Sequence, residues 1–276
     1  MRCQACTSAI ALVFLLTMPL AGARAAEAIK YPDWSGQWER IGGGSFDPNK
    51  RPGRGQQPPL TAEYQAVWEA NMAEEKTGGQ SYNTQVYCLP GGMPRMMTAY
   101  QPMEVIVTPE ATYIPIAFFH EFRRIYTDGR DWPAGITPTF SGYSIGRWTG
   151  ADGAFDALEV ETRALKGPRI LDPSGIPLHP DNQTIVRERF ALDAANPDIL
   201  HDVITTFDHA LTRPWTVDKT YRRIRNPTWI EDNCAENNMY VFVGKQSYFR
   251  GADGNLMPTR KDQPPPQLRG FGAGAR

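Results

Sequence analysis

Alternating apolar and polar positions run through most of the chain beyond residue 100. The alternation predicts strands over 141–148, 157–162, 184–192, 199–207 and 215–223, and nearly continuous apolar runs predict two more, buried on both faces, over 103–107 and 111–119. Short turns separate these strands at intervals of about 10–15 residues, which is typical of antiparallel sheets. We therefore expect a mainly β protein that forms an antiparallel barrel or a strongly curved sandwich.

One segment, 61–76, has helical periodicity instead. Thr61 is suited to cap its first turn and Glu63 complements the helix dipole. Four large side chains share one face of this N-terminal helix: Tyr64, Val67, Trp68 and Met72. The chain has no Gly-rich phosphate loop between a strand and a helix, so a nucleotide-binding α/β fold is not expected.

The first 25 residues have the pattern of a secretory signal peptide. A basic start at Arg2 precedes an apolar run over 9–16, and the segment ends Ala23-Arg24-Ala25. The apolar run is too short to span a membrane, and no later stretch is suited to stable membrane insertion. We expect an exported, periplasmic protein that is cleaved after Ala25.

The rest of the chain divides into a single β-rich domain with a ligand cavity over 26–250 and a disordered tail over 251–276. The tail is rich in Pro, Gly, Gln and Arg. Removal of Arg2 and Arg24 with the signal peptide leaves 27 basic against 30 acidic residues, a formal charge of −3. This balance provides no general attraction to nucleic acid or to an anionic membrane.

Two cysteines, Cys88 and Cys234, remain after processing. In an oxidising compartment a disulfide between them is the natural interpretation, and closing so long a loop stabilises by roughly 4–5 kcal/mol on the chain-entropy model. Two buried or metal-binding thiols remain the alternative. No CxxC, HxH or HExxH motif occurs, so we expect neither a Cys/His zinc site nor any other metal or cofactor.

Acidic, basic and aromatic residues are densest around 120–130. If this segment is one extended strand, Tyr126, Asp128 and Arg130 share a face with Arg124. We take Tyr126 and Asp128 as candidate catalytic groups and the two arginines as ligands for a substrate carboxylate or phenolate. A solvent-facing strand with cross-strand ion pairs is the alternative.

Three histidines are weighed as acid–base groups. His120 is expected on an aromatic wall with Phe118 and Phe122, as a catalytic base or a structural histidine. His179 and Asp181 lie in a loop, where a carboxylate that orients an imidazole is a sound catalytic arrangement. For His209, solvent exposure is the favoured interpretation.

The remaining candidate substrate-binding residues lie on strands. Tyr143, Arg147 and Trp148 belong to one strand, and aromatic positions of this kind belong either to a cavity wall or to the core. Glu188 alternates with Val186 and Phe190, so we expect it to point inward, with a partner such as Arg147. It is either an acid or base with a raised pKa or one half of a structural ion pair.

Five segments resemble a widespread bacterial family of secreted proteins, frequent in sphingomonads and acidobacteria and mostly hypothetical. They are PMEVIV, EFRRIYTDGR, SGYSIGRW, RPWTVDKTYRR and CAENN, within about 90–238. Members often carry His-Pro after DGR, where this chain has Asp131-Trp132-Pro133. Their G-x-P-H-S-D-like segment is displaced by one residue here, at 176–181. More loosely, the chain is similar in kind to cofactor-independent lyases and decarboxylases of lignin-derived aromatic dimers.

Two functions follow as expectations. The first is a cofactor-independent periplasmic lyase that decarboxylates, deformylates or dehydrates a small aromatic compound by acid–base chemistry. The second is a non-catalytic carrier of lipocalin-like design that binds the same class of small molecule. A structural, envelope-associated role is the least favoured interpretation, and the oligomeric state stays open.

Overall fold

The structure is a computed structural model and describes residues 30–77, 79, 82–151, 154–234, 239–243 and 246–266. The expected signal peptide lies outside these residues, as does the last part of the expected tail, 267–276.

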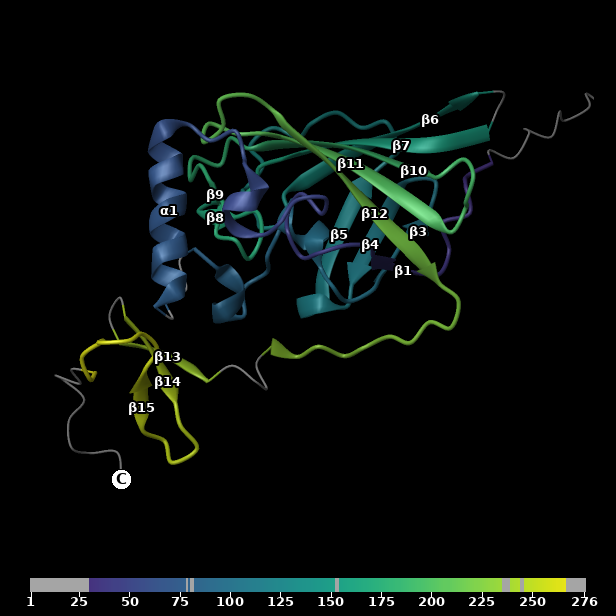
Figure 1. Cartoon of the computed structure of the whole chain (residues 1–276). Coiled ribbons are helices and arrows are strands. Elements are labelled where there is room, and N and C mark those ends of the chain that lie inside the picture. Colours follow the sequence, from purple (N-terminus) through teal and green to yellow (C-terminus); the bar gives the residue numbers. More distant parts are fainter. Residues whose placement is uncertain are drawn as a thin grey trace, which may run out of the picture.

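Nine of the described strands close into a barrel (Figure 1). Around the barrel they follow the order β2 (Met103–Glu104), β1 (Gln37–Arg40), β12 (Trp215–Ile224), β11 (Ile199–Phe207), β10 (Ile185–Leu192), β7 (Ala154–Arg163), β6 (Tyr143–Ala151), β5 (Glu121–Tyr126) and β4 (Ala111–Ile116). The pair Met103 and Ile116 joins β2 to β4 and closes the ring. Neighbours are antiparallel except β5 and β6, which pair in parallel. The expected mainly β, barrel-like fold is confirmed.

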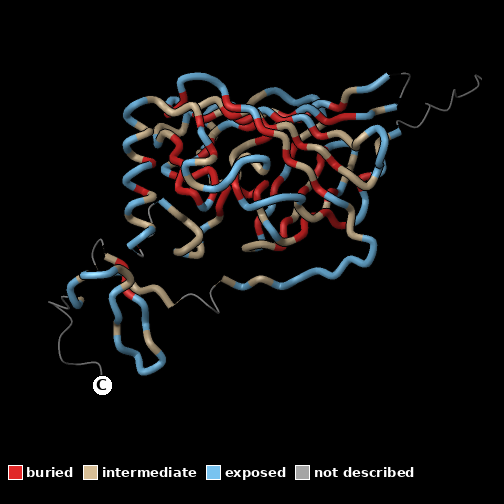
Figure 2. Tube along the Cα trace, in the orientation of Figure 1, coloured by how far each residue is buried: buried red, intermediate tan, exposed pale blue. Residues whose placement is uncertain are grey.

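The strands form where the alternation predicts them because one face of each is buried inside the barrel. On β11 the inward positions Leu200, Asp202, Ile204 and Thr206 are buried, whereas their neighbours are partly exposed. Figure 2 shows buried positions concentrated in the barrel strands and the connections between them.

Two expected strands near the centre of the sequence are shorter than predicted. The run 103–107 divides into β2 and β3 (Ile106–Val107), and β4 ends at Ile116 rather than at residue 119. A short 3-10 helix, Phe118–His120, follows, in which Phe119 and His120 have the left-handed φ angles 57° and 48°. His120 is therefore exposed on a turn, which corrects its expected place on a strand wall.

The interior of the barrel is filled by side chains, which corrects the expectation of a ligand cavity there. Met93, Met96 and Met97 are buried in it, together with Trp215 and Tyr221. The hollow beside Tyr221 has a volume of about 10 Å³. That is room for no more than about one water molecule.

The predicted helix is confirmed as α1 (Ala62–Lys76), which stands beside one end of the barrel (Figure 1). Its cap is Thr61, whose hydroxyl accepts a hydrogen bond from the Tyr64 amide. Its buried face is anchored by Trp68, whose indole donates to the Ser174 carbonyl at 2.7 Å. Ser174 belongs to the loop around β8 (Arg169–Ile170) and β9 (Pro177–Leu178), so the helix holds this loop against the barrel.

A second, three-stranded sheet of β13 (Tyr240–Val243), β14 (Gln246–Arg250) and β15 (Leu256–Pro258) lies apart from the barrel. The presence of β15 corrects the expectation that disorder begins at Gly251. The expected disulfide between Cys88 and Cys234 is formed. Together with the ion pair between Arg260 and Glu74, it links this C-terminal region to the main body.

Candidate functional site

A groove of about 940 Å³ lies on the outer face of the barrel, over β6, β7, β10 and β11. It is lined by Tyr31, Pro109, Thr127, Gly129, Arg130, Asp131, Trp132, Ile145, Gly146, Arg147, Trp148, Phe155, Glu159, Val160, Glu161, Arg187, Glu188, Arg189, Val203 and Thr205. The volume is within the range of small-molecule sites, roughly 300–1,000 Å³.

Strand register arranges the charges on the floor of the groove. Glu159 on β7 lies directly opposite Arg147 on β6 and Arg189 on β10. One step along the strands, Glu161 lies opposite Arg187. Directly opposed residues have Cβ atoms about 4.5–5.5 Å apart, so each carboxylate is placed next to a guanidinium.

The two floor glutamates differ in their partners. Glu161 accepts hydrogen bonds from Arg163 Nε at 2.5 Å and Arg187 Nε at 2.7 Å. Burial raises the pKa of Glu161, but these bonds outweigh it and lower the pKa. Glu159 is exposed and has no hydrogen bond or ion pair from its side chain in the described part of the chain. It is the carboxylate on the groove floor that is open to a ligand.

Arg130 makes several contacts at the rim. Its guanidinium donates to Asp128 Oδ2 at 2.6 Å and lies 3.7 Å from the centre of the Tyr126 ring. A further bond runs from Nη1 to the Tyr143 hydroxyl at 3.4 Å, and Tyr143 stacks on Tyr126. Hydrogen bonds from Arg130 lower the pKa of Asp128.

This rim brings together the predicted group of Tyr126, Asp128 and Arg130, but not on one strand. β5 ends at Tyr126, and Asp128 and Arg130 lie in a bend that includes Gly129 with a φ of 78°. Arg124 remains on β5 and donates to the Tyr126 hydroxyl at 3.5 Å. It supports the tyrosine from outside the groove lining.

The opposite end of the groove is aromatic. Tyr31 and Phe155 are partly exposed there and pack against Trp148, which is 8% exposed and points inward from β6, with ring centres 5.2 and 6.0 Å away. Trp132 stands at the rim, where the Arg163 guanidinium lies 4.3 Å from its ring centre. A planar ligand in the groove would thus meet aromatic surface as well as arginines.

Glu188 does not serve the groove with its side chain. It points into the barrel and accepts hydrogen bonds from both terminal nitrogens of Arg123, one of them at 2.8 Å. Both side chains are at most 1% exposed. The expected partner, Arg147, lies on the opposite face of the sheet, so that expectation is corrected.

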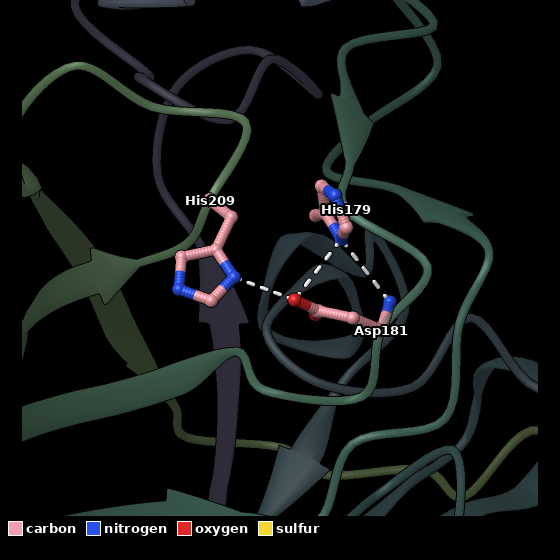
Figure 3. Close-up of side chains that lie close together, drawn as sticks. All are labelled: His179, Asp181 and His209. Atoms are coloured by element: carbon pink, nitrogen blue, oxygen red, sulfur yellow. Dashed lines mark hydrogen bonds and ion pairs between the residues drawn. The ribbon is translucent and has the colours of Figure 1, made fainter.

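A separate constellation lies near the start of β10 and the end of β11 (Figure 3). Asp181 Oδ2 is 3.1 Å from His179 Nδ1 and 2.5 Å from His209 Nδ1. Burial raises the pKa of Asp181, but hydrogen bonds from the Gln183 amide and His209 outweigh it and lower the pKa. The predicted His179–Asp181 contact therefore exists, and a second imidazole joins it.

Asp208 fixes the two loops that carry these side chains. Its Oδ1 accepts hydrogen bonds from the amides of His179 and Ala210, and its Oδ2 accepts one from the Thr184 hydroxyl. Across the cluster, the ring of Tyr64 on α1 lies 5.4 Å from that of His179. The imidazoles are thus positioned from several elements.

Sequence reasoning missed Glu159, Arg187 and Arg189 in the groove, and His209 in the second cluster. The alternation around inward-facing Glu188 already placed both arginines outward. The hairpin register, in which Ile185 pairs with Phe207, indicates that the loop before β10 meets the residues after β11. That register was the signal for His209.

His179, Asp181 and His209 each offer a ligand atom, and these atoms lie within 4.8 Å of one another. Among the described residues, these three side chains form a group that is suited to a metal ion.

No described helix is both long and apolar enough to cross a membrane. No protein-family model matches the chain, and a search of curated proteins finds no significant match.

Proposed function

We propose that the protein binds a small aromatic acid or phenol in the outer groove and acts on it as a lyase, by acid–base chemistry without a cofactor. The observation that carries the proposal is the juxtaposition, in one groove, of an unengaged carboxylate, several arginines and an aromatic wall. Each part suits one step of the reaction.

Arginines give the proposed site its preference for an anion. Arg147 and Arg189 flank Glu159 and have no ion pair among the described residues. A guanidinium can hold a carboxylate through two parallel hydrogen bonds, and such charge-assisted bonds are roughly twice as strong as neutral ones. The substrate anion takes the place of the water around these arginines.

Glu159 is the proposed base. In a dehydration, Glu159 accepts the proton of an acidic C–H bond and the freed electron pair forms the new double bond. The leaving hydroxyl group takes a proton from the solvent that fills the open groove and departs as water. The arginines stabilise the negative charge that develops on the substrate.

The proposal is tested with the processed protein, incubated with two-ring aromatic acids and followed by mass spectrometry. A mass loss equal to water, carbon dioxide or formaldehyde is the expected result. Glu159→Gln should lower kcat by about 10²–10⁴-fold and change substrate affinity little, whereas Glu69→Gln on the exposed side of α1 should retain activity. Loss of turnover in His179→Ala, with Glu159→Gln unimpaired, would move the base to the His179–Asp181 pair.

The second candidate is a carrier that uses the same groove without chemistry. The observation in its favour is that the groove lies open on the outer face, whereas lyases commonly exclude water from the reacting atoms. A ligand-induced rise in melting temperature with unchanged compounds would establish the carrier and overturn the lyase.

We also propose that the protein is exported to the periplasm. The Cys88–Cys234 disulfide supports an oxidising compartment. The signal-like N-terminus and the resemblance to secreted proteins point the same way. Fractionation of cells that express the full chain should recover the shortened protein outside the cytoplasm, and recovery of the uncut protein in the cytoplasm would refute export.

A further inference from the structure

We propose that His179, Asp181 and His209 form a binding site for one divalent transition-metal ion of the Zn²⁺, Co²⁺, Ni²⁺ or Cu²⁺ class. This site is distinct from the groove and does not depend on the proposed lyase activity. It replaces our expectation, drawn from the absence of simple motifs, that the chain binds no metal.

The donor atoms suit such an ion. Two imidazole nitrogens and a carboxylate oxygen are ligands that Zn²⁺ and its neighbours prefer, whereas Mg²⁺ and Ca²⁺ prefer oxygen alone. Two histidines and one carboxylate also constitute a known three-ligand set that leaves positions open for water or another ligand.

The distances are close to those that coordination needs. Ligand atoms at about 2.0–2.2 Å from a metal lie roughly 3–4 Å apart. Asp181 Oδ2 is already 3.1 Å from His179 Nδ1, and the three ligand atoms lie within 4.8 Å of one another. The 2.5 Å contact between Asp181 and His209 Nδ1 must open by less than about 1.5 Å to admit an ion. A rotation of exposed His209 accomplishes this (Figure 3).

The metal-free protein already holds the three ligand side chains close together. Asp208 joins the His179 loop to the segment that carries His209, and the Asn182 side chain accepts a hydrogen bond from the Gly167 amide at 2.8 Å. The ligands converge from two loops without a metal, so little ordering remains for the binding step. Without a metal, His179 Nδ1 accepts a hydrogen bond from the Asp181 amide at 3.2 Å, and the ion takes the place of this bond and of the contact between His209 and Asp181.

His201 provides a matched comparison within the chain. It lies between two carboxylates, 3.4 Å from Asp193 and 3.1 Å from Asp218. The ligand atoms of these three side chains do not converge as those of His179, Asp181 and His209 do. His201→Ala therefore removes an imidazole that is as exposed as His179, 31% against 32%, and that also lies beside carboxylates, without touching the proposed site.

The test uses untagged, chelator-treated mature protein without any substrate. Isothermal titration with Zn²⁺, and the visible absorption of bound Co²⁺, should show one ion per chain. His209→Ala and Asp181→Ala should each weaken binding by more than about 100-fold. Asp208→Asn, a positioning change, should weaken it by roughly 10–100-fold, and His201→Ala should leave it unchanged. Near-ultraviolet circular dichroism checks that each variant is folded.

Binding should also weaken as the pH falls and the imidazoles take up protons. Failure of the wild type to bind at millimolar Zn²⁺, or equal binding by His209→Ala and the wild type, would overturn the proposal. Because no substrate is present, either result leaves the lyase and carrier proposals to be decided by their own experiment.

Discussion

At the scale of single residues, the face of the sheet on which a charge lies decides what it does. Glu188 and its neighbours Arg187 and Arg189 are consecutive, yet the first is buried inside the barrel and the other two line an exposed groove. Inside, Glu188 is held by Arg123, and both charges depend on this pairing because the surroundings exclude water. Outside, Arg187 pairs with Glu161, whereas Arg189 has no ion pair among the described residues and is open to a ligand.

Breaking the buried pair should therefore be far more damaging than breaking an exposed one. Glu188→Gln leaves the Arg123 charge buried without its counter-ion, and the free energy of unfolding should fall by about 3–5 kcal/mol. Glu161→Gln removes a partner of the exposed Arg187, and its cost should be about 1 kcal/mol or less. Urea unfolding of both variants measures the difference. Equal losses would contradict this account of the barrel interior.

Buried Lys219 makes the stability of the folded protein depend on pH. Burial lowers the pKa of Lys219 to about 8, although Asp202, directly across the strand pair, and Asp172 oppose the shift. In the unfolded chain the pKa is about 10.4, so between these values the unfolded state binds more protons and stability rises with pH.

We expect this rise to contribute roughly 3 kcal/mol between about pH 8 and pH 10.5. Below pH 8 the full cost of burying the ammonium is present. Lys219→Met should lose this rise, and Lys50→Met, on an exposed loop, should keep it. Urea unfolding across the pH range tests the prediction, and parallel curves for the wild type and Lys219→Met would refute it.

At the scale of elements, the strands were predictable because burial of one face places apolar residues at every second position. β11 has the predicted limits, and β10 and β12 each differ from prediction by one residue at one end. The segment around β4 and β5 was less predictable. Phe119 and His120 adopt left-handed backbone conformations, which residues with large side chains rarely do. The conformational preferences of these residues therefore did not predict the turn.

The C-terminal sheet shows how a covalent link substitutes for a core. β13 to β15 are mostly half-buried or exposed (Figure 2), and Cys88–Cys234 ties the chain just before them to the main body. Cys88→Ser with Cys234→Ser should lower the free energy of unfolding by roughly 4–5 kcal/mol on the chain-entropy model. It should also make 225–234 sensitive to limited proteolysis, while a wild-type pattern of cleavage would show that the link is dispensable.

At the scale of the whole molecule, the barrel encloses a filled core, and its outer face carries the groove. The filling was not predictable from the sequence, because the side chains that occupy the interior, such as Met96 and Met97, come from a connection between strands. The groove was not predictable from the sequence either. Its floor joins two hairpins, β6–β7 and β10–β11, side by side, and its rim comes from the bend after β5.

The central claim is that this outer groove binds aromatic acids through Arg147 and Arg189, and calorimetry tests it directly. Biphenyl-4-carboxylate and its neutral carboxamide would be titrated into the wild type and into Arg147→Gln/Arg189→Gln. The account predicts that the double substitution weakens binding of the acid by about tenfold or more, the loss expected for charge-assisted hydrogen bonds, and hardly changes binding of the amide. Unchanged affinity for the acid in the double variant, or no binding to the wild type, would contradict it.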